Sequence, residues 1–225
     1  MKALKQEEPK GWEGLLNPDW IKEMDATPFL SRCRSGQVTI AELKEYLVQQ
    51  YFYSRHFTRY LCALLSNMSD EEDRQALTEN LVDEAGLGEV KGIPHSRIYR
   101  SMLDSFGLEP KVSKPLPETE SLVKLMLLSC RDSDGAVGLG ALCIGAEAIV
   151  PHLYGQIVKG FEANGFTKEQ LHFFYLHMEC DDEHSATMQK IILNRFADEV
   201  SLTKLGTSAQ NLIKARTLFF EALSV

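Results

Sequence analysis

Apolar positions along the chain recur at helical spacing over most of its length. Between residues 39 and 67, for example, Leu43, Leu47 and Tyr51 stand four positions apart and form one face for a neighbouring helix to cover. Strand signals, in which β-branched residues alternate with polar ones between tight turns, are almost absent. The pattern therefore predicts an all-α protein.

Helix start and stop signals divide this pattern into segments. Three pairs fit a capping box, in which a hydroxyl and a carboxylate or amide satisfy free N–H groups at a helix start. The pairs are Thr39 with Glu42, Ser69 with Glu72, and Thr167 with Gln170. Glycines stand where helices can end, at Gly36, Gly107 and Gly135. The predicted helices cover residues 18–24, 27–35, 39–67, 70–85, 95–106, 118–132, 136–163, 168–198 and 201–223.

Long helices with short connections are typical of a helical bundle. The Pro-rich connection at residues 110–117 is too short to separate two domains, so we expect one domain covering residues 1–225. Bundle interiors are common places for metal sites built from carboxylates and imidazoles. Carboxylates and imidazoles within the predicted helices are therefore the first candidates for a functional site.

Composition and charge narrow the functional classes. Apolar residues make up 44% of the chain and charged residues 25%, as in an ordinary globular protein. The net charge of −8 offers no positive field for nucleic acid or anionic lipid. We found no signal peptide and no apolar run near the roughly 20 residues that cross a membrane. The five cysteines form no CxxC pair, and we expect a cytoplasmic protein with reduced thiols.

The strongest local signal is the segment from His177 to His184, HMECDDEH, within a predicted helix. Positions i, i+4 and i+7 share one helix face, so His177, Asp181 and His184 project together. Apolar neighbours such as Phe173 and Ile191 indicate that part of this helix is buried. The alternative is an exposed acidic turn with incidental histidines.

A second signal is Glu147, the one acidic residue in a long stretch of small and apolar residues. A buried carboxylate is costly unless it is paired or bound to a metal ion. Pro151 cannot donate a hydrogen bond to the Glu147 carbonyl, so the segment predicts a kink there. The alternative is a kinked helix with one hydrogen-bonded glutamate.

The third signal is a carboxylate and an imidazole on either side of a glycine-containing loop. Glu84 ends one predicted helix and His95 begins the next, so both could reach one ion across the loop. Asp83 and Glu89 are competing choices for the carboxylate.

Three carboxylates and three imidazoles suit iron or manganese better than a thiolate-rich zinc site. Two ions bridged by carboxylates are the natural stoichiometry for such a set. The candidate ligands are Glu84, His95, Glu147, His177, Asp181 and His184.

The order of these residues resembles the heme-oxygenase-like diiron oxidases and oxygenases, from about residue 26 to about residue 198. The resemblance implies a seven-helix fold, often dimeric, in which the six candidate ligands hold two iron ions. It further implies an external electron donor, dioxygen as cosubstrate and a peroxo-diferric intermediate. Members of this family oxidise small amine- or amino-acid-derived metabolites by N-oxygenation, carbon–carbon cleavage or nitrile formation. We therefore expect a small-molecule substrate and a possible homodimer.

The chain departs from the para-aminobenzoate-forming members of that family. Those members use a tyrosine and a lysine near the metal, where this chain has Leu30 and Ile157. We therefore expect an external substrate and no self-sacrificing reaction. Arg55, Arg59 and His152 are candidates for holding a substrate carboxylate. The alternative is that these three are ordinary surface cations.

Two other functions remain open from the sequence. Thiaminase-like and pyrroloquinoline-quinone-synthase-like enzymes share this fold without needing a diiron ligand set. A helical interaction protein would have the acidic stripe as a solvated surface only. The complete set of candidate ligands counts against the first alternative, and the lone glutamate in an apolar helix counts against the second.

Overall fold

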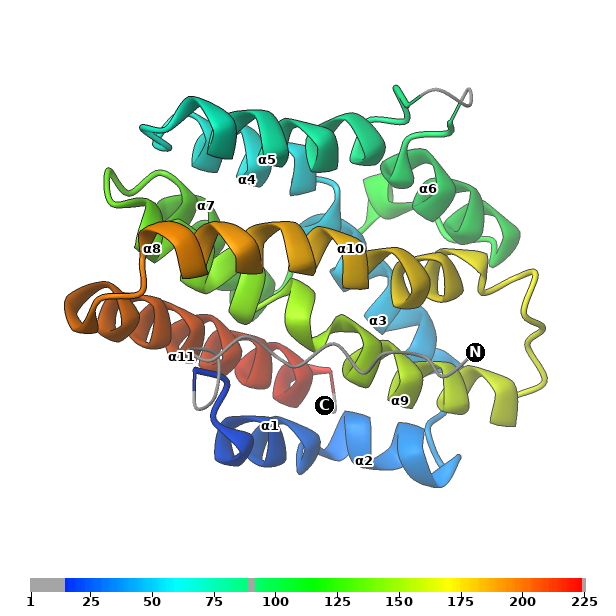
Figure 1. Ribbon diagram of the computed structural model, residues 1–225. Helices are drawn as coiled ribbons and strands as arrows, with labels where there is room; N and C mark the ends of the chain where they lie inside the picture. The colour runs from blue at the N-terminus through cyan, green and yellow to red at the C-terminus, as the bar shows by residue number, and fades with distance from the viewer. Residues whose placement is uncertain (1–14, 89–91, 224–225) are drawn as a thin grey trace, which may run out of the picture.

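The computed structural model describes residues 15–88 and 92–223, with only the backbone for residues 179–183. Every regular element among these residues is helical, which confirms the all-α prediction (Figure 1). The α-helices are α1 (Pro18–Asp25), α2 (Pro28–Ser35), α3 (Ile40–Ser54), α4 (Phe57–Leu65), α5 (Glu71–Glu84), α6 (His95–Ser105), α7 (Pro117–Cys130), α8 (Gly135–Leu139), α9 (Val150–Ala163), α10 (His172–Arg195) and α11 (Glu199–Ala222). Shorter helical turns are η1 (Pro110–Val112), the π-helical η2 (Gly140–Ile144) and η3 (Glu147–Ile149).

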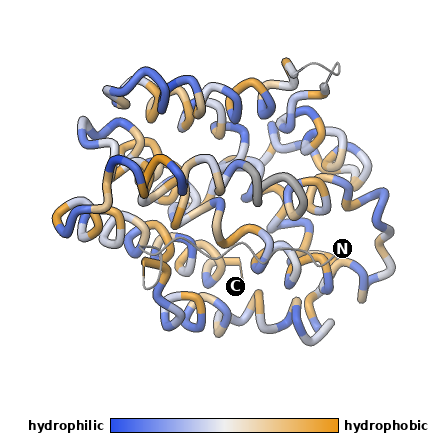
Figure 2. The backbone as a smooth tube through the Cα atoms, in the orientation of Figure 1, coloured by the Kyte–Doolittle hydropathy of each residue, from blue (hydrophilic) through white to orange (hydrophobic). Residues whose placement is uncertain are grey.

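Helix α10 runs through the middle of the bundle (Figure 1). It packs against α5 and α6, which are distant in the sequence, and against η3 and α9, which precede it in the chain. Helix α11 lies beneath it in the same view and packs against α1, α7, α8 and η2. Apolar and polar residues alternate along the helices, as expected where each helix has one buried face (Figure 2).

Aromatic side chains fix α10 against its neighbours. The Tyr46 ring lies 5.4 Å from Phe29, 6.2 Å from Phe174 and 6.3 Å from Phe220, centroid to centroid. All four side chains are fully buried and come from α2, α3, α10 and α11. Burying each such ring contributes about 1.5–3 kcal/mol, so this cluster is a major anchor of the helix that carries His177.

The predicted helix ends are partly confirmed. Thr39 forms the expected capping box with Glu42 at the start of α3. Gly36 ends α2 in the left-handed region, with φ 68°. Gly107, with φ 67°, directly follows the C-cap of α6.

Other boundary predictions are wrong. Asp70, rather than Ser69, caps α5, because its carboxylate accepts the N–H groups of the first turn. Thr167 and Gln170 exchange hydrogen bonds as predicted, but they lie in a turn, and α10 begins only at His172. Gly135 begins α8 instead of ending a helix.

The helix predicted at 39–67 is two helices. It breaks at Arg55 and His56, and α4 begins at Phe57. Neither glycine nor proline marks this break, so the periodic pattern could not reveal it. The break puts Arg55 in an exposed turn rather than on a continuous helix face.

The segment predicted as one helix at 136–163 is also interrupted. At Gly140 an added Cβ would lie only 2.4 Å from the Leu205 carbonyl oxygen, so η2 approaches α11 too closely for any side chain. Pro151 stands in the first turn of α9, where its missing N–H leaves no helical bond unmade. The predicted kink is confirmed as a full break, and Glu147 begins the η3 turn within it.

Residues 135–163 also correct the expectation about apolar runs. This segment is long and apolar enough to cross a membrane by length and composition, with a mean hydropathy of 1.6 in its most apolar 18-residue window. In the fold, however, 78% of its most apolar window is buried. Its hydropathy is accounted for by its place in the protein core.

Candidate metal centre

A tight crossover joins α5 to α6 and brings Glu84 close to His95. The Leu87 N–H bonds to the Val82 carbonyl and the Gly86 N–H to the Asp83 carbonyl, which is the hydrogen-bond pattern of a Schellman motif. Gly86 is left-handed, with φ 65°. Residues 93–94 return so closely over Gly86 that an added Cβ would lie 2.5 Å from the backbone nitrogen of Pro94.

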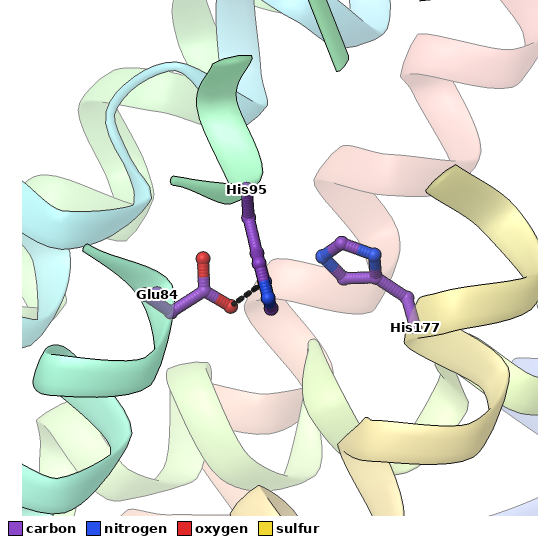
Figure 3. A group of neighbouring side chains, drawn as sticks. All are labelled: Glu84, His95 and His177. Carbon is purple, nitrogen blue, oxygen red and sulfur yellow. Dashed lines mark ion pairs between the residues drawn. The ribbon is translucent and has the colours of Figure 1, made fainter. Parts of the chain in front are cut away.

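Glu84 and His95 form a buried pair at this crossover (Figure 3). Glu84 Oε1 lies 3.0 Å from His95 Nδ1, and both residues are 6% exposed. Burial alone would raise the pKa of Glu84, but pairing with His95 and the nearby imidazole charges lower it. Burial alone would lower the pKa of His95, but Glu84 and then Asp83 raise it. Placing an anion at the negative end of the α5 dipole costs stability, which favours a functional reason for Glu84.

Asp83 lies on the other side of the same imidazole. Its Oδ2 is 3.1 Å from His184 Nε2 and 3.8 Å from His95 Nε2. The Asp83 side chain is 51% exposed, in contrast to buried Glu84. The other competing choice, Glu89, lies outside the residues that the structure describes.

His177 approaches the pair from α10 (Figure 3). Its ring lies 4.7 Å from the His95 ring, centroid to centroid. His177 Nδ1 lies 2.8 Å from the Phe173 carbonyl oxygen, which can only accept, so Nδ1 carries the proton and Nε2 keeps a free lone pair. Burial lowers the pKa of His177 to about 4. The imidazole is therefore neutral and held in the tautomer that a metal ligand needs.

Together these three side chains fit a metal ion. One ligand atom from each of Glu84, His95 and His177 lies within 4.8 Å of the others. First-row metal ions hold nitrogen and oxygen ligands at about 2.0–2.2 Å, which places ligand atoms roughly 3–4 Å apart. His95 Nδ1 is buried and makes no hydrogen bond of normal geometry to any described group, although Glu84 is close. Two ligand atoms that are near each other but poorly aligned are arranged as they would be around a shared cation.

Glu147 reaches the same cavity from η3. The cavity is lined by Glu84, His95, Glu147 and His177, and Glu147 is 3% exposed. Two buried carboxylates in one cavity repel each other, and a cation relieves that repulsion. The break at η3 is therefore what turns this carboxylate toward the pair on α5 and α6.

The last two predicted ligands lie further along α10. His184 is 7% exposed and contacts Asp83 as described above. Asp181 belongs to the α10 helix, but its side chain is outside what the structure describes. The structure thus brings Glu84, His95, Glu147 and His177 to one cavity and places His184 beside it, across Asp83.

The sequence matches the model of a family described as iron-containing redox enzymes over residues 44–216. The chain belongs to this family. It is 27% identical over 177 residues to the 4-aminobenzoate synthase of Chlamydia muridarum, covering 76% of this chain and 72% of the relative. The 4-aminobenzoate synthase of Chlamydia trachomatis is 26% identical, with coverages of 76% and 74%.

Solved structures share the fold across nearly the whole chain. A TenA homolog from Pseudomonas syringae has a TM-score of 0.79 at 14% identity, covering 99% of this chain and 97% of that one. A CADD-like protein of unknown function from Nostoc punctiforme has a TM-score of 0.77 at 20% identity, with coverages of 93% and 92%. A domain from Shewanella denitrificans with a heme oxygenase-like fold has a TM-score of 0.75 at 19% identity, with coverages of 94% and 89%. These similarities confirm the predicted heme-oxygenase-like fold.

The three residues predicted to hold a substrate carboxylate lie in different places. Arg55 is exposed and lines the cavity of the candidate ligands. Arg59 is absent from that lining and contacts His56 Nδ1 at 3.1 Å. His152 pairs with Asp25 at 3.0 Å on the outer side of α9 and does not line the cavity.

Arg216 on α11 is buried and also lines the cavity, but it was not among the residues predicted from the sequence. A signal for it exists in the sequence. Leu212 and Ile213 precede it, and Phe219 and Phe220 follow it, at the spacing of one helix face, and all four are buried. A charge in the middle of an apolar face marks a residue that is not an ordinary surface cation.

Proposed function

We propose that this member of the iron-containing redox enzymes is a non-heme diiron enzyme, which uses dioxygen to oxidise a small amine- or amino-acid-derived metabolite. The observation that carries the proposal is the buried cluster of Glu84, His95 and His177 in a cavity that Glu147 also lines. Family membership supports iron as the metal. The mixed nitrogen and oxygen donors are the ligands that iron accepts in such sites.

Six side chains would hold the two irons. They are Glu84, His95, Glu147, His177, Asp181 and His184. Bound ferrous ions would supply the electrons that reduce dioxygen, and an external donor would restore them.

The protein's own residues prepare the site for this chemistry. The hydrogen bond from His177 Nδ1 to the Phe173 carbonyl holds the imidazole in one tautomer and orientation. A metal ion would bind a deprotonated Glu84 and a neutral His95, so metal binding at this pair should depend on pH. The rings of Tyr99, Tyr154 and Phe173 line the cavity and limit the access of water.

The relatives named as 4-aminobenzoate synthases suggest one outcome for the reaction, but two positions argue against a self-sacrificing version of it. Leu30 and Ile157 are fully buried and apolar, so neither can supply a phenol or an amine. A lysine and a tyrosine do occur elsewhere in the chain, at Lys159 and Tyr53. Lys159 is exposed on the surface, whereas Tyr53 is buried and lines the cavity. We therefore favour a reaction on an external small molecule.

The test begins with iron-free protein under anaerobic conditions. Ferrous iron is added, bound iron per chain is measured, and oxygen is then admitted while the visible absorbance is followed by stopped flow. We expect about two irons per chain and a transient visible band. His177→Ala and Glu147→Ala should remove both signals, because each deletes a ligand.

A variant outside the cavity provides the control. His152→Ala should bind iron and react with oxygen as the wild type does, because His152 pairs with Asp25 instead. Absence of specific iron binding by the wild type would overturn the proposal. It would then favour a metal-free enzyme on the same fold.

A further inference from the structure

A chain of aromatic rings leads from the protein surface to the candidate ligand His177. The Tyr51 ring of α3 lies 6.2 Å from the Tyr99 ring of α6, centroid to centroid. Tyr99 lies 4.6 Å from Phe173 of α10, and Phe173 lies 3.9 Å from the His177 ring. Tyr51 is half-buried, whereas the other three residues are buried. The four rings therefore connect the surface with the candidate metal centre across three helices.

Two arginines hold the outer end of this ring chain. The guanidinium carbons of Arg55 and Arg100 lie 5.8 Å and 5.9 Å from the centre of the Tyr51 ring. Arg100 Nη2 also donates a hydrogen bond to the Tyr51 hydroxyl, at 3.1 Å. Both arginines are exposed. They fix the Tyr51 ring at the surface and keep further N–H donors available to a partner.

A third exposed arginine, Arg59, extends this positive surface. Arg55 Nε lies 3.3 Å from His56 Nε2, and Arg59 Nη1 lies 3.1 Å from His56 Nδ1. Burial lowers the pKa of His56, and the charges of Arg55 and Arg59 lower it further. Within residues 15–88 and 92–223, none of Arg55, Arg59 and Arg100 forms an ion pair with a described carboxylate. These three residues together form the arginine patch.

The charge of the whole chain makes the arginine patch selective for an acidic partner. The chain carries a net charge of −8, so an acidic protein is repelled by the molecule as a whole. Exposed cations without ion pairs attract it instead and would orient it over Tyr51. Electron-transfer partners commonly form small, transient interfaces of this kind.

The ring chain indicates which kind of acidic partner fits. The proposed function needs an external donor whose electrons reach iron at a buried site. Electron transfer weakens steeply as the gap between donor and acceptor grows, and closely spaced aromatic rings shorten each gap. A nucleic acid bound at the same arginines would make no use of rings that lead into the core.

We propose that the arginine patch docks an acidic one-electron carrier protein, whose electrons tunnel to the metal centre through Tyr51, Tyr99 and Phe173. In each transfer the carrier is oxidised by one electron and one ferric ion is reduced to the ferrous state. Two transfers therefore restore both ferrous ions, and no covalent bond forms or breaks. The inference rests on the proposed function for its electron acceptor, but docking does not require the metal.

Docking is tested on the full-length, iron-free protein. The probe is a plant-type ferredoxin, a small acidic iron–sulfur protein that carries one electron. Its affinity is measured by NMR titration at low and high ionic strength. We expect the affinity to fall as salt is added, because salt screens exposed charges.

Charge-reversal variants identify the surface that binds. Arg100→Glu should weaken ferredoxin binding at low salt by about tenfold. Arg59→Glu should weaken it as well, without removing a contact of Tyr51. Lys214→Glu is the matched control, because Lys214 is an exposed cation on α11, which packs against α1, α2, α7, α8 and η2. It should leave the affinity nearly unchanged, and circular dichroism establishes that each variant folds.

Two variants of Tyr51 separate docking from electron transfer. Tyr51→Leu and Tyr51→Phe both keep the arginine patch, so both should bind ferredoxin. Stopped flow then follows the oxidation of reduced ferredoxin, at saturating concentration, by oxidised iron-loaded protein. Tyr51→Leu should slow this transfer several-fold because it removes a ring, and Tyr51→Phe should retain the wild-type rate because it keeps one. Metal analysis establishes that the variants hold the same amount of iron.

Absence of ferredoxin binding at low salt, or an affinity that neither salt nor Arg100→Glu changes, would overturn the docking surface. Equal transfer rates in Tyr51→Leu and the wild type would overturn the ring route. Salt-dependent ferredoxin binding by a protein that holds no iron would leave the docking surface standing and contradict the proposed function. A diiron protein that does not bind ferredoxin would do the reverse.

Discussion

Replacing Gly86 by alanine should loosen the candidate metal centre without touching a ligand. Gly86 has φ 65°, and an added Cβ would lie 2.5 Å from Pro94 N, 2.7 Å from the Ile93 carbonyl carbon and 2.9 Å from Pro94 Cδ. Two of these three atoms are backbone, so no side-chain rotation can relieve the contact. Reaching the 3.4 Å of ordinary contact requires the start of α6 to move by about 0.9 Å.

Two effects set the energetic cost of Gly86→Ala, namely backbone strain and steric overlap. A left-handed conformation costs a residue with a Cβ about 1–2 kcal/mol, and forced overlap costs about 1–3 kcal/mol more. We therefore expect Gly86→Ala to lower the free energy of unfolding by about 2–5 kcal/mol. Because His95 begins α6, the same movement separates it from Glu84 and should weaken iron binding by about 10- to 100-fold.

Gly107→Ala provides a matched control. Gly107 has φ 67°, but an added Cβ there would meet nothing within 4 Å. It should therefore show the strain alone, about 1–2 kcal/mol by urea denaturation, and wild-type iron affinity by anaerobic titration. Equal loss of stability in the two variants, with unchanged iron affinity in Gly86→Ala, would refute the idea that the crossover sets the ligand spacing.

Three further predictions concern charge and capping. Glu84→Gln should bind less iron per chain than Asp83→Asn, as measured by metal analysis, because Glu84 is buried at the cluster and Asp83 is exposed. The opposite order would make Asp83 the ligand. In iron-free protein, the His177 pKa of about 4 lies below the 6.5 of an ordinary histidine, so the unfolded chain takes up the proton first. The contribution of His177 to the free energy of unfolding should fall from pH 6.5 toward pH 4, by at most about 3 kcal/mol, and should be absent from His177→Gln. Because the raised pKa of His95 acts in the opposite direction, the wild type and His177→Gln are compared by urea denaturation. The same pH dependence in both proteins would contradict the burial of a neutral His177. Thr39→Ala should cost about 0.5–2 kcal/mol by removing the capping box, and any change in iron affinity would count against its purely local role.

Helical periodicity was sufficient to predict the fold class because each helix buries one face. It could not locate breaks that depend on tertiary contacts. The turn at Arg55 and His56 has no local sequence signal, and the π turn at Gly140 exists because η2 lies against α11. Pro151 did mark the break near Glu147, since a missing N–H acts locally.

The candidate ligands were accessible from sequence because chemistry-bearing residues stood out against apolar neighbours or shared a helix face. The convergence of Glu84 and His95 could be proposed from the sequence but not established, because the distance between them depends on the left-handed conformation at Gly86. Arg216 was missed because a single arginine near Lys214 looks like a surface charge until the burial of its helix face is known.

Mössbauer spectroscopy of protein loaded with ⁵⁷Fe(II) under anaerobic conditions and then exposed to oxygen tests directly whether the chain holds a diiron centre. We expect a spectrum dominated by a magnetically coupled pair of ferric ions, because two irons held by one cluster of ligands would lie close together. Spectra of isolated mononuclear ferric ions, or of iron that stays ferrous, would contradict an oxygen-activating diiron centre.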